Sequence, residues 1–219
     1  MNTPIKITRE EKPIYYSAEK LAYWYFRLNG CFLLENFLVH HEVKKNGNGT
    51  EVDLLAMRFP HRQELKLTGV PMPDDPIFKN DKIEVYFAEV KSNQMCNINS
   101  SWLDPDYKNM ERLLYIVGAL PENDVEFAAQ KLYKDCFYEN DLCRFRLMAI
   151  GAEKNNDLNN GITQIIWKDA IHFIYDRLHT YWYYKKEHNK WDEMGKRLFD
   201  MAKSYSKDKF IEHISGKLI

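Results

Sequence analysis

The chain has 219 residues, of which 45% are hydrophobic and 29% are charged, and this balance fits a soluble globular protein with one substantial core. A formal net charge of -1 gives no overall basic excess, so binding of nucleic acid would have to rely on local clusters such as Lys44-Lys45 and Lys185-Lys186. There is no run of about 20 apolar residues and no apolar signal region, so we expect no membrane span and a cytoplasmic location. The four cysteines form no CxxC pair, which argues against a zinc module and against a disulfide framework.

The N-terminal part of the chain predicts a helix followed by a β-hairpin. Ser17 can cap a helix that runs to Asn29 and is ended by Gly30. A strand is predicted over residues 32–43, and the turn sequence at residues 46–49, Asn-Gly-Asn-Gly, leads into a second strand.

Glu89, Val90 and Lys91 follow an apolar run, residues 83–88, which predicts a strand covered on both faces. Side chains at positions i and i+2 of a strand share a face, so Glu89 and Lys91 are neighbours. If the second strand ends near Asp53, its carboxylate could lie beside Glu89 and give a hard divalent cation two oxygen ligands. Lys91 would then supply a fixed positive charge for the attacking water or the developing phosphorane-like charge. A structural salt bridge between Glu89 and Lys91 is the alternative explanation.

The second half of the chain predicts elements that extend and cover the sheet. These are a polar loop over residues 92–103, a helix over 106–120, strands over 144–151 and 162–167, a helix over 169–184 and two short amphipathic helices between 191 and 219. We divide the chain into a domain over residues 1–168 and a C-terminal helical extension over residues 169–219 that packs on the same domain. The aromatic residues of the predicted helix 169–184 fit core packing, a homodimer interface, or stacking of unpaired bases beside Lys185-Lys186.

This order of helix, hairpin, Asp and Glu-x-Lys resembles the PD-(D/E)xK phosphodiesterase superfamily, which has the restriction-endonuclease-like fold. The resemblance implies an α/β fold with an αβββαβ core, in which helices flank a mixed central sheet, plus the C-terminal helical extension. It implies that Asp53, Glu89 and Val90 form a site for Mg²⁺, with Mn²⁺ as an alternative ion. It also implies that Lys91 orients or activates the nucleophilic water and that Glu19 on the first helix is an accessory catalytic acid.

The resemblance covers roughly residues 17–167 and has two departures from the family pattern. Val52 precedes Asp53, where the family nominally has proline, and the long segment of residues 60–82 separates the two strands that carry the metal ligands. Neither departure removes a charged group. Glu19 also has a simpler explanation, because an acid in the first turn of a helix complements the helix dipole.

The expected function is therefore metal-dependent hydrolysis of phosphodiester bonds in nucleic acid, with DNA favoured over RNA as the partner. The alternative is a catalytically inactive nuclease-like module that binds nucleic acid or a protein partner, which the near-neutral charge and the aromatic tail favour. Other catalytic classes find little support, because the chain contains no glycine-rich phosphate loop, no nucleophile elbow and no HExxH motif.

Overall fold

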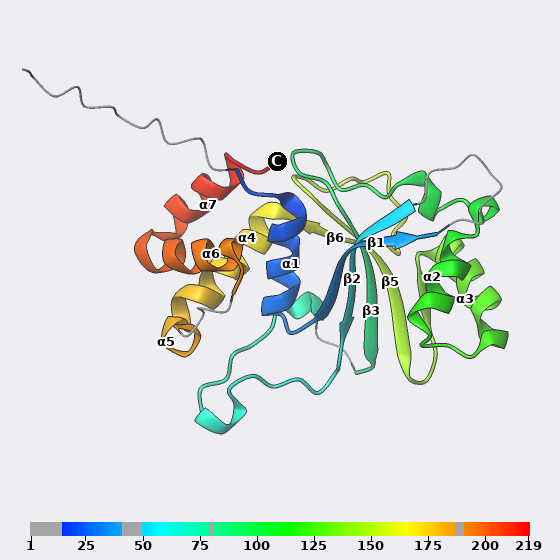
Figure 1. Cartoon of the computed structure of the whole chain (residues 1–219), viewed down its shortest axis with the longest axis horizontal. Coiled ribbons are helices and arrows are strands. Elements are labelled where there is room, and N and C mark those ends of the chain that lie inside the picture. Colours follow the sequence, from blue (N-terminus) through cyan, green and yellow to red (C-terminus); the bar gives the residue numbers. More distant parts are fainter. Residues whose placement is uncertain (1–14, 41–49, 79–80, 187–190) are drawn as a thin grey trace, which may run out of the picture.

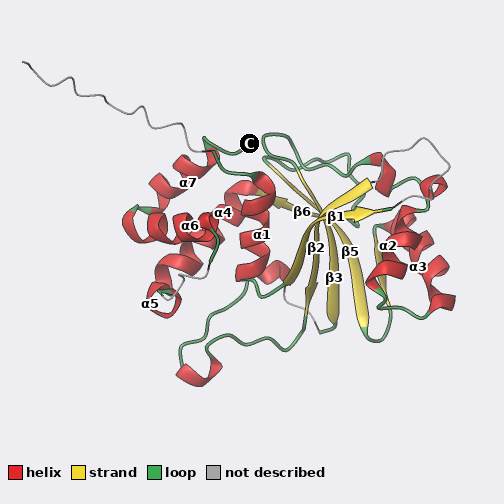
Figure 2. Cartoon of the chain, viewed as in Figure 1, coloured by secondary structure: helices red, strands yellow, loops and turns green. Residues whose placement is uncertain are grey.

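The computed structural model confirms a mixed α/β fold, in which one sheet lies between two groups of helices (Figure 1, Figure 2). It describes residues 15–40, 50–78, 81–186 and 191–219. Within these residues six strands form a single sheet with both parallel and antiparallel pairs. The more specific αβββαβ core of the resemblance stays a prediction.

The sheet is built around two long central strands. Its members are β1 (Phe32–Val39), β2 (Thr50–Arg58), β3 (Ile83–Val90), β4 (Phe137–Glu139), β5 (Cys143–Gly151) and β6 (Thr163–Ile166). The order is β1-β2-β3-β5-β4, and β6 pairs with the far end of β5. The β3–β5 and β5–β6 pairs are parallel, whereas the other pairs are antiparallel. β3 and most of β5 are buried on both faces, which is why their sequences read as near-continuous apolar runs.

The helices divide into two groups, one on each face of the sheet. They are α1 (Ala18–Leu28), α2 (Asn109–Val117), α3 (Glu122–Asp135), α4 (Trp167–Thr180), α5 (Trp182–Lys185), α6 (Glu193–Ser204) and α7 (Lys207–Ser215). In Figure 1, α1 and the C-terminal helices lie on one side of the sheet, and α2 and α3 lie on the other. Each group encloses its own cluster of buried apolar side chains against the sheet.

The first helix forms as its sequence predicts. The Ser17 side chain accepts a hydrogen bond from the backbone N–H of Lys20 at 3.2 Å and so caps α1. Gly30 follows the helix in the left-handed region with φ of +78°, and a Cβ atom there would collide with the Arg62 side chain. The backbone conformation therefore favours glycine at this position, and any larger residue would also force the Arg62 side chain to move.

The C-terminal helices share their core with the rest of the chain. The cluster that holds α1 against β2 and β3 also contains buried residues of α4, α6 and α7. Tyr16 forms a parallel bridge with Leu218, and the backbone N–H of Ile219 donates to the Tyr16 carbonyl at 2.9 Å. Residues from both sides of the predicted boundary at 168 thus lie in one hydrophobic cluster.

Among the α-helices and strands of the described residues, two have no counterpart in the sequence-based prediction. α3 buries Val125, Leu132 and two alanines, and the small alanine side chains give a weak periodic signal. Pro121, which predicts the end of one helix, lies at the N-cap of this next helix, where the backbone is extended and the missing N–H of proline costs no helical hydrogen bond. β4 has three residues and is too short to carry a recognisable alternation.

The predicted helix 169–184 is wrong in its boundaries. α4 begins at Trp167, which the sequence pattern predicts as the end of the preceding strand, and the helix breaks at Tyr181 before α5. Tyr181 leaves helical geometry, and its hydroxyl donates to the Pro71 carbonyl at 2.8 Å. This tertiary contact accounts for the break in a segment whose apolar periodicity predicts one continuous helix.

β1 ends at Val39, which is shorter than the predicted strand over residues 32–43. Residues 41–49, which include the predicted turn and Lys44-Lys45, lie outside the described residues.

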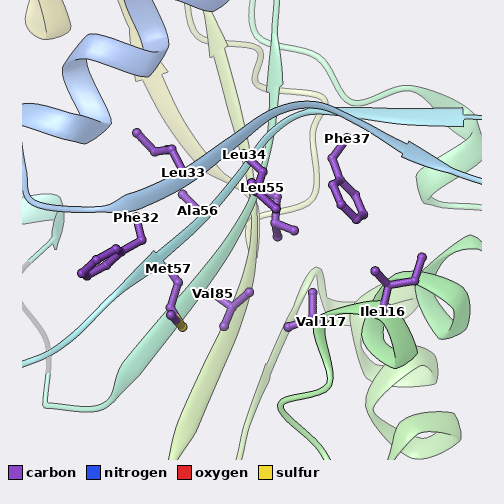
Figure 3. Close-up of a pocket in the computed structure, with 10 residues that line it drawn as sticks. All are labelled: Phe32, Leu33, Leu34, Phe37, Leu55, Ala56, Met57, Val85, Ile116 and Val117. Atoms are coloured by element: carbon purple, nitrogen blue, oxygen red, sulfur yellow. The ribbon is translucent and has the colours of Figure 1, made fainter. Parts of the chain in front are cut away.

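An apolar groove of about 340 Å³ lies between the β1 edge of the sheet and α2 (Figure 3). The Phe37 ring points from β1 towards Ile116 on α2, and Val85 of β3 contributes to the floor. Phe32 and Leu34 on this edge are 64% and 54% exposed. Across the described ranges, every helix is too short or too polar to cross a membrane.

Candidate active site

Asp53 and Glu89 lie opposite one another where the β2–β3 ladder opens. The last antiparallel pair of the ladder is Leu54 with Ala88, and the same register places Asp53 across from Glu89. Instead of a ladder bond, the backbone N–H of Val90 donates to Oδ2 of Asp53 at 2.7 Å. The register therefore brings together the two carboxylates that the sequence predicts as metal ligands.

The β1–β2 ladder is interrupted at the same point. Its pairs pass from Glu35 with Leu54 to Phe37 with Val52, so that Asp53 has no paired residue on this side either. The residue of β1 in that gap, Asn36, has a positive φ of 49°, a conformation that asparagine tolerates better than most residues. This irregularity leaves Asp53 outside both ladders in the middle of the sheet.

Glu89 is held by two side chains at the end of β3. Its side chain is 4% exposed, and Oε1 accepts a hydrogen bond from Nζ of Lys91 at 3.0 Å and another from Nδ2 of Asn99. Nζ of Lys91 also donates to Oδ1 of Asn99 at 3.1 Å. Glu89, Lys91 and Asn99 thus form a closed triangle of polar contacts, and one of the three ammonium N–H donors of Lys91 has no recorded partner in the described residues.

The main chain of Lys91 is fixed on both sides. Its N–H donates to the Ile150 carbonyl at 2.8 Å, which continues the parallel pairing of β3 with β5. Its carbonyl accepts a hydrogen bond from Nε1 of Trp167 at 2.8 Å. Since Trp167 is the first residue of α4, this contact ties the end of β3 to the start of the C-terminal helices.

Burial and neighbouring charge raise the pKa values of both carboxyl groups. Burial raises the pKa of Asp53, although the Val90 N–H and the Lys91 charge act in the opposite direction. Burial and the negative charge of Asp53 raise the pKa of Glu89 to about 7. The apolar floor beneath Glu89, which includes Val52 and Phe87, accounts for the burial.

Glu19 lies near this pair but does not join it. It occupies the first turn of α1, where Oγ of Ser17 donates to its carboxylate at 2.6 Å. Its charge contributes to the raised pKa of Asp53, as does that of Glu51, a residue that the sequence did not mark. The structure therefore places Glu19 within electrostatic reach of Asp53, while its recorded hydrogen bond is to Ser17.

Asp53 and Glu89 provide the minimum set of protein oxygen ligands for a hard cation. In the part of the chain that the structure describes, no group of three or more His, Cys, Asp or Glu side chains is placed to hold a metal ion. Two carboxylates in mutual repulsion are present, and oxygen donors of this kind match Mg²⁺ or Mn²⁺ when water and substrate oxygens complete the coordination. Asp53 and Glu89, with the main chain at Val90, are the residues that would hold such an ion.

Asn99 is a site residue that the sequence did not reveal. It lies in the polar segment after β3, and the return of that segment to Glu89 depends on tertiary structure. The predicted basic cluster Lys185-Lys186 belongs elsewhere: Lys185 forms an ion pair with Glu64, and Nζ of Lys186 lies 4.0 Å from the centroid of the Tyr183 ring.

No known protein family, curated protein or solved structure shows a significant match to this chain. The resemblance to PD-(D/E)xK enzymes therefore stays a prediction, which depends on Asp53, Glu89, Lys91 and their arrangement.

The raised pKa of Glu89 predicts a pH-dependent stability of the metal-free protein. Its pKa is about 7 in the folded chain against an ordinary value of 4.5, so the folded state holds the proton more tightly than the unfolded state. This contribution is fully present below about pH 4.5 and is lost as the pH rises to 7, at a cost of about 3 kcal/mol. We expect Glu89→Gln to remove this dependence, measured as Tm against pH in the presence of a chelator. Parallel Tm profiles for the two proteins would contradict it.

Proposed function

We propose that this protein is a metal-dependent nuclease that hydrolyses phosphodiester bonds of nucleic acid, with DNA as the favoured substrate. The observation that supports this most directly is the placement of Asp53 opposite Glu89, with the Lys91 ammonium bound to Glu89 at 3.0 Å. Two acids and one lysine, at the point where the strand ladders are interrupted, form a site where a phosphate can contact both a bound cation and an N–H donor.

Each side chain has a distinct role in this proposal. Asp53 and Glu89 would hold the divalent ion, which when bound polarises the scissile phosphate as a Lewis acid. Lys91 directs its remaining N–H towards the attacking water or a phosphate oxygen and offsets negative charge as it develops there. Asn99 keeps the Lys91 ammonium in place, so that little reorganisation is needed during reaction.

The proposal is tested by incubating the purified protein with Mg²⁺ or Mn²⁺ on supercoiled, linear, single-stranded and branched DNA and on RNA. Cleavage that requires the added ion supports a nuclease, and the substrate that is cut identifies the polymer. Failure to cut any of these substrates would favour the alternative below.

A non-catalytic nuclease-like module is the second candidate function. The closed contacts among Glu89, Lys91 and Asn99, and the absence of a third acidic ligand in the described residues, favour a buried polar network of structural value. Such a module would use its surface to bind nucleic acid or a protein partner.

The two functions differ in how stability responds to metal. If Asp53 and Glu89 bind Mg²⁺ or Mn²⁺, an ion concentration of about 100 times Kd should stabilise the fold by about 2.7 kcal/mol and raise Tm by about 5 to 10 °C. We expect Asp53→Asn to lose this shift and the exposed-site control Asp141→Asn to keep it, as measured by thermal unfolding. An equal shift in both variants, or none in the unmodified protein, would favour the non-catalytic module.

A further inference from the structure

A second pocket lies at the opposite end of β2 from the candidate active site. Its volume is about 360 Å³, and it is formed mainly by the long segment between β2 and β3. In Figure 1 this segment, coloured cyan, extends from the lower end of the sheet. Arg58 at the end of β2 lines the pocket, and five residues of extended strand, about 17 Å, separate it from Asp53.

The pocket is surrounded by more positive than negative charge. Arg58, Arg62 and Lys66 line it, and Arg177 of α4 and Lys185 of α5 join the same cluster through ion pairs. The opposing carboxylates of this cluster are Asp74 and Glu64. The seven side chains therefore carry a formal excess of three positive charges.

Two of the three arginines in this cluster are deeply buried, and each has an N–H donor without a hydrogen-bond partner among the described residues. Arg58 is 3% exposed and Arg177 is 2% exposed, so neither can rely on water to solvate its charge. Nη1 of each has no hydrogen-bond partner among the described residues, and for Arg177 the nearest carboxylate oxygen, on Glu64, is 3.6 Å away. Buried donors without partners are costly, and Arg58 belongs to the pocket lining, where an anion would offset this cost.

Neighbouring acids do not remove the excess. Asp75 follows Asp74 in sequence, and its Oδ2 accepts a hydrogen bond from the Tyr25 hydroxyl at 2.9 Å. This neutral donor leaves the negative charge of Asp75 in place, so counting Asp75 reduces the formal excess from three positive charges to two. Burial lowers the pKa of Arg177, and the charges of Asp74 and Glu64 offset that effect only in part. Lys66 is exposed at the pocket and forms no ion pair with any residue in the described ranges.

We propose that this pocket binds a phosphate-bearing small molecule of nucleotide size. Guanidinium groups match the geometry of phosphate oxygens and bind them through paired hydrogen bonds. A volume near 360 Å³ is in the range of ligand pockets, and prolines 60, 71 and 73 with Met72 provide apolar walls for the rest of the molecule. The segment that separates the two metal-ligand strands thus acquires a function of its own, independent of the nuclease proposal.

The test is thermal unfolding and calorimetric binding of the full chain, with a chelator present and at matched ionic strength. The probes are inorganic phosphate, adenosine monophosphate, adenosine triphosphate and sodium chloride. We expect a nucleotide at about 100 times Kd to raise Tm by about 5 °C or more, and chloride to have no such effect. An equally large Tm shift with inorganic phosphate would identify free phosphate as the ligand. That result would support phosphate binding by the arginine cluster and contradict a ligand of nucleotide size.

Four variants locate the binding. Lys66→Glu and Arg62→Ala should each weaken binding by about tenfold or more, each compared with its own ligand-free Tm. Lys134→Glu, on α3, should leave binding unchanged, and Lys91→Ala should also leave it unchanged because the nuclease site is distant. The absence of any shift, or equal binding by Lys66→Glu and Arg62→Ala, would overturn the proposal and reduce the cluster to a structural ion network.

Discussion

Lys91→Ala and Asp53→Ala are each expected to reduce metal-dependent cleavage of DNA by about a hundredfold to a thousandfold. Lys91 is the cation nearest to the paired carboxylates, and the loss of one preorganised group that stabilises developing charge typically costs this much. Asp53→Ala removes one of the two carboxylates that would hold the ion. The rate of cleavage of the substrate identified in the first assay, at saturating Mg²⁺, measures both effects.

The matched control for charge is Lys134→Ala, because Lys134 is an exposed lysine on α3. Circular dichroism and Tm establish that the variants remain folded. Unchanged cleavage by both Lys91→Ala and Asp53→Ala, in preparations free of contaminating nuclease, would rule out this site as the source of activity.

Asp74→Ala is expected to destabilise the protein by about 3 to 5 kcal/mol. Asp74 accepts hydrogen bonds from Arg58 at 2.7 Å, from Arg177 at 3.1 Å and from Arg62, and its removal leaves buried guanidinium groups without their main counter-ion. For a chain of this length the loss corresponds to a fall in Tm of about 6 to 20 °C. Urea unfolding at neutral pH measures the change in free energy.

Asp157→Ala serves as the control for this prediction, since Asp157 is exposed and a surface substitution should change the free energy of unfolding by less than about 0.5 kcal/mol. If Asp74→Ala behaves like this control, the arginine cluster does not depend on Asp74. A phosphate ion that restores part of the lost stability in Asp74→Ala would further indicate that the cluster accepts external anions.

Helices and strands can be predicted from the sequence where a short segment carries the residues that start, end and bury the element. The helix from Ser17 is marked by a cap, an apolar stripe and a terminal glycine, and the structure contains each of them. β3 is recognisable because burial on both faces produces a mainly apolar run, and β5 is recognisable because apolar residues alternate with charged residues in its first half. The short β4 and the alanine-rich α3 lack such local signals, and only the tertiary contacts define them.

The same distinction applies to the candidate site. Glu89 and Lys91 share a face because of strand geometry alone, so their proximity could be predicted. The contact of Asn99 depends on how a loop returns to the sheet, and the gap in the ladders at Asp53 depends on the backbone of Asn36 in another strand. Sequence spacing predicts neither the Asn99 contact nor the gap in the ladders. It also does not predict the contact of Arg177 with Asp74, because Arg177 lies on a helix about 100 residues further along the chain.

The bridge between Tyr16 and Leu218 has a consequence for biosynthesis. About 200 residues separate α1 from the last of its packing partners, and at roughly 5 to 20 residues per second a ribosome needs about 10 to 40 s to supply them. During that interval the apolar surface of α1 that later contacts α4 and α6 has no permanent cover, although β2 and β3 are already present. Completion of the core around α1 therefore has to wait until the residues near Leu218 have been synthesised.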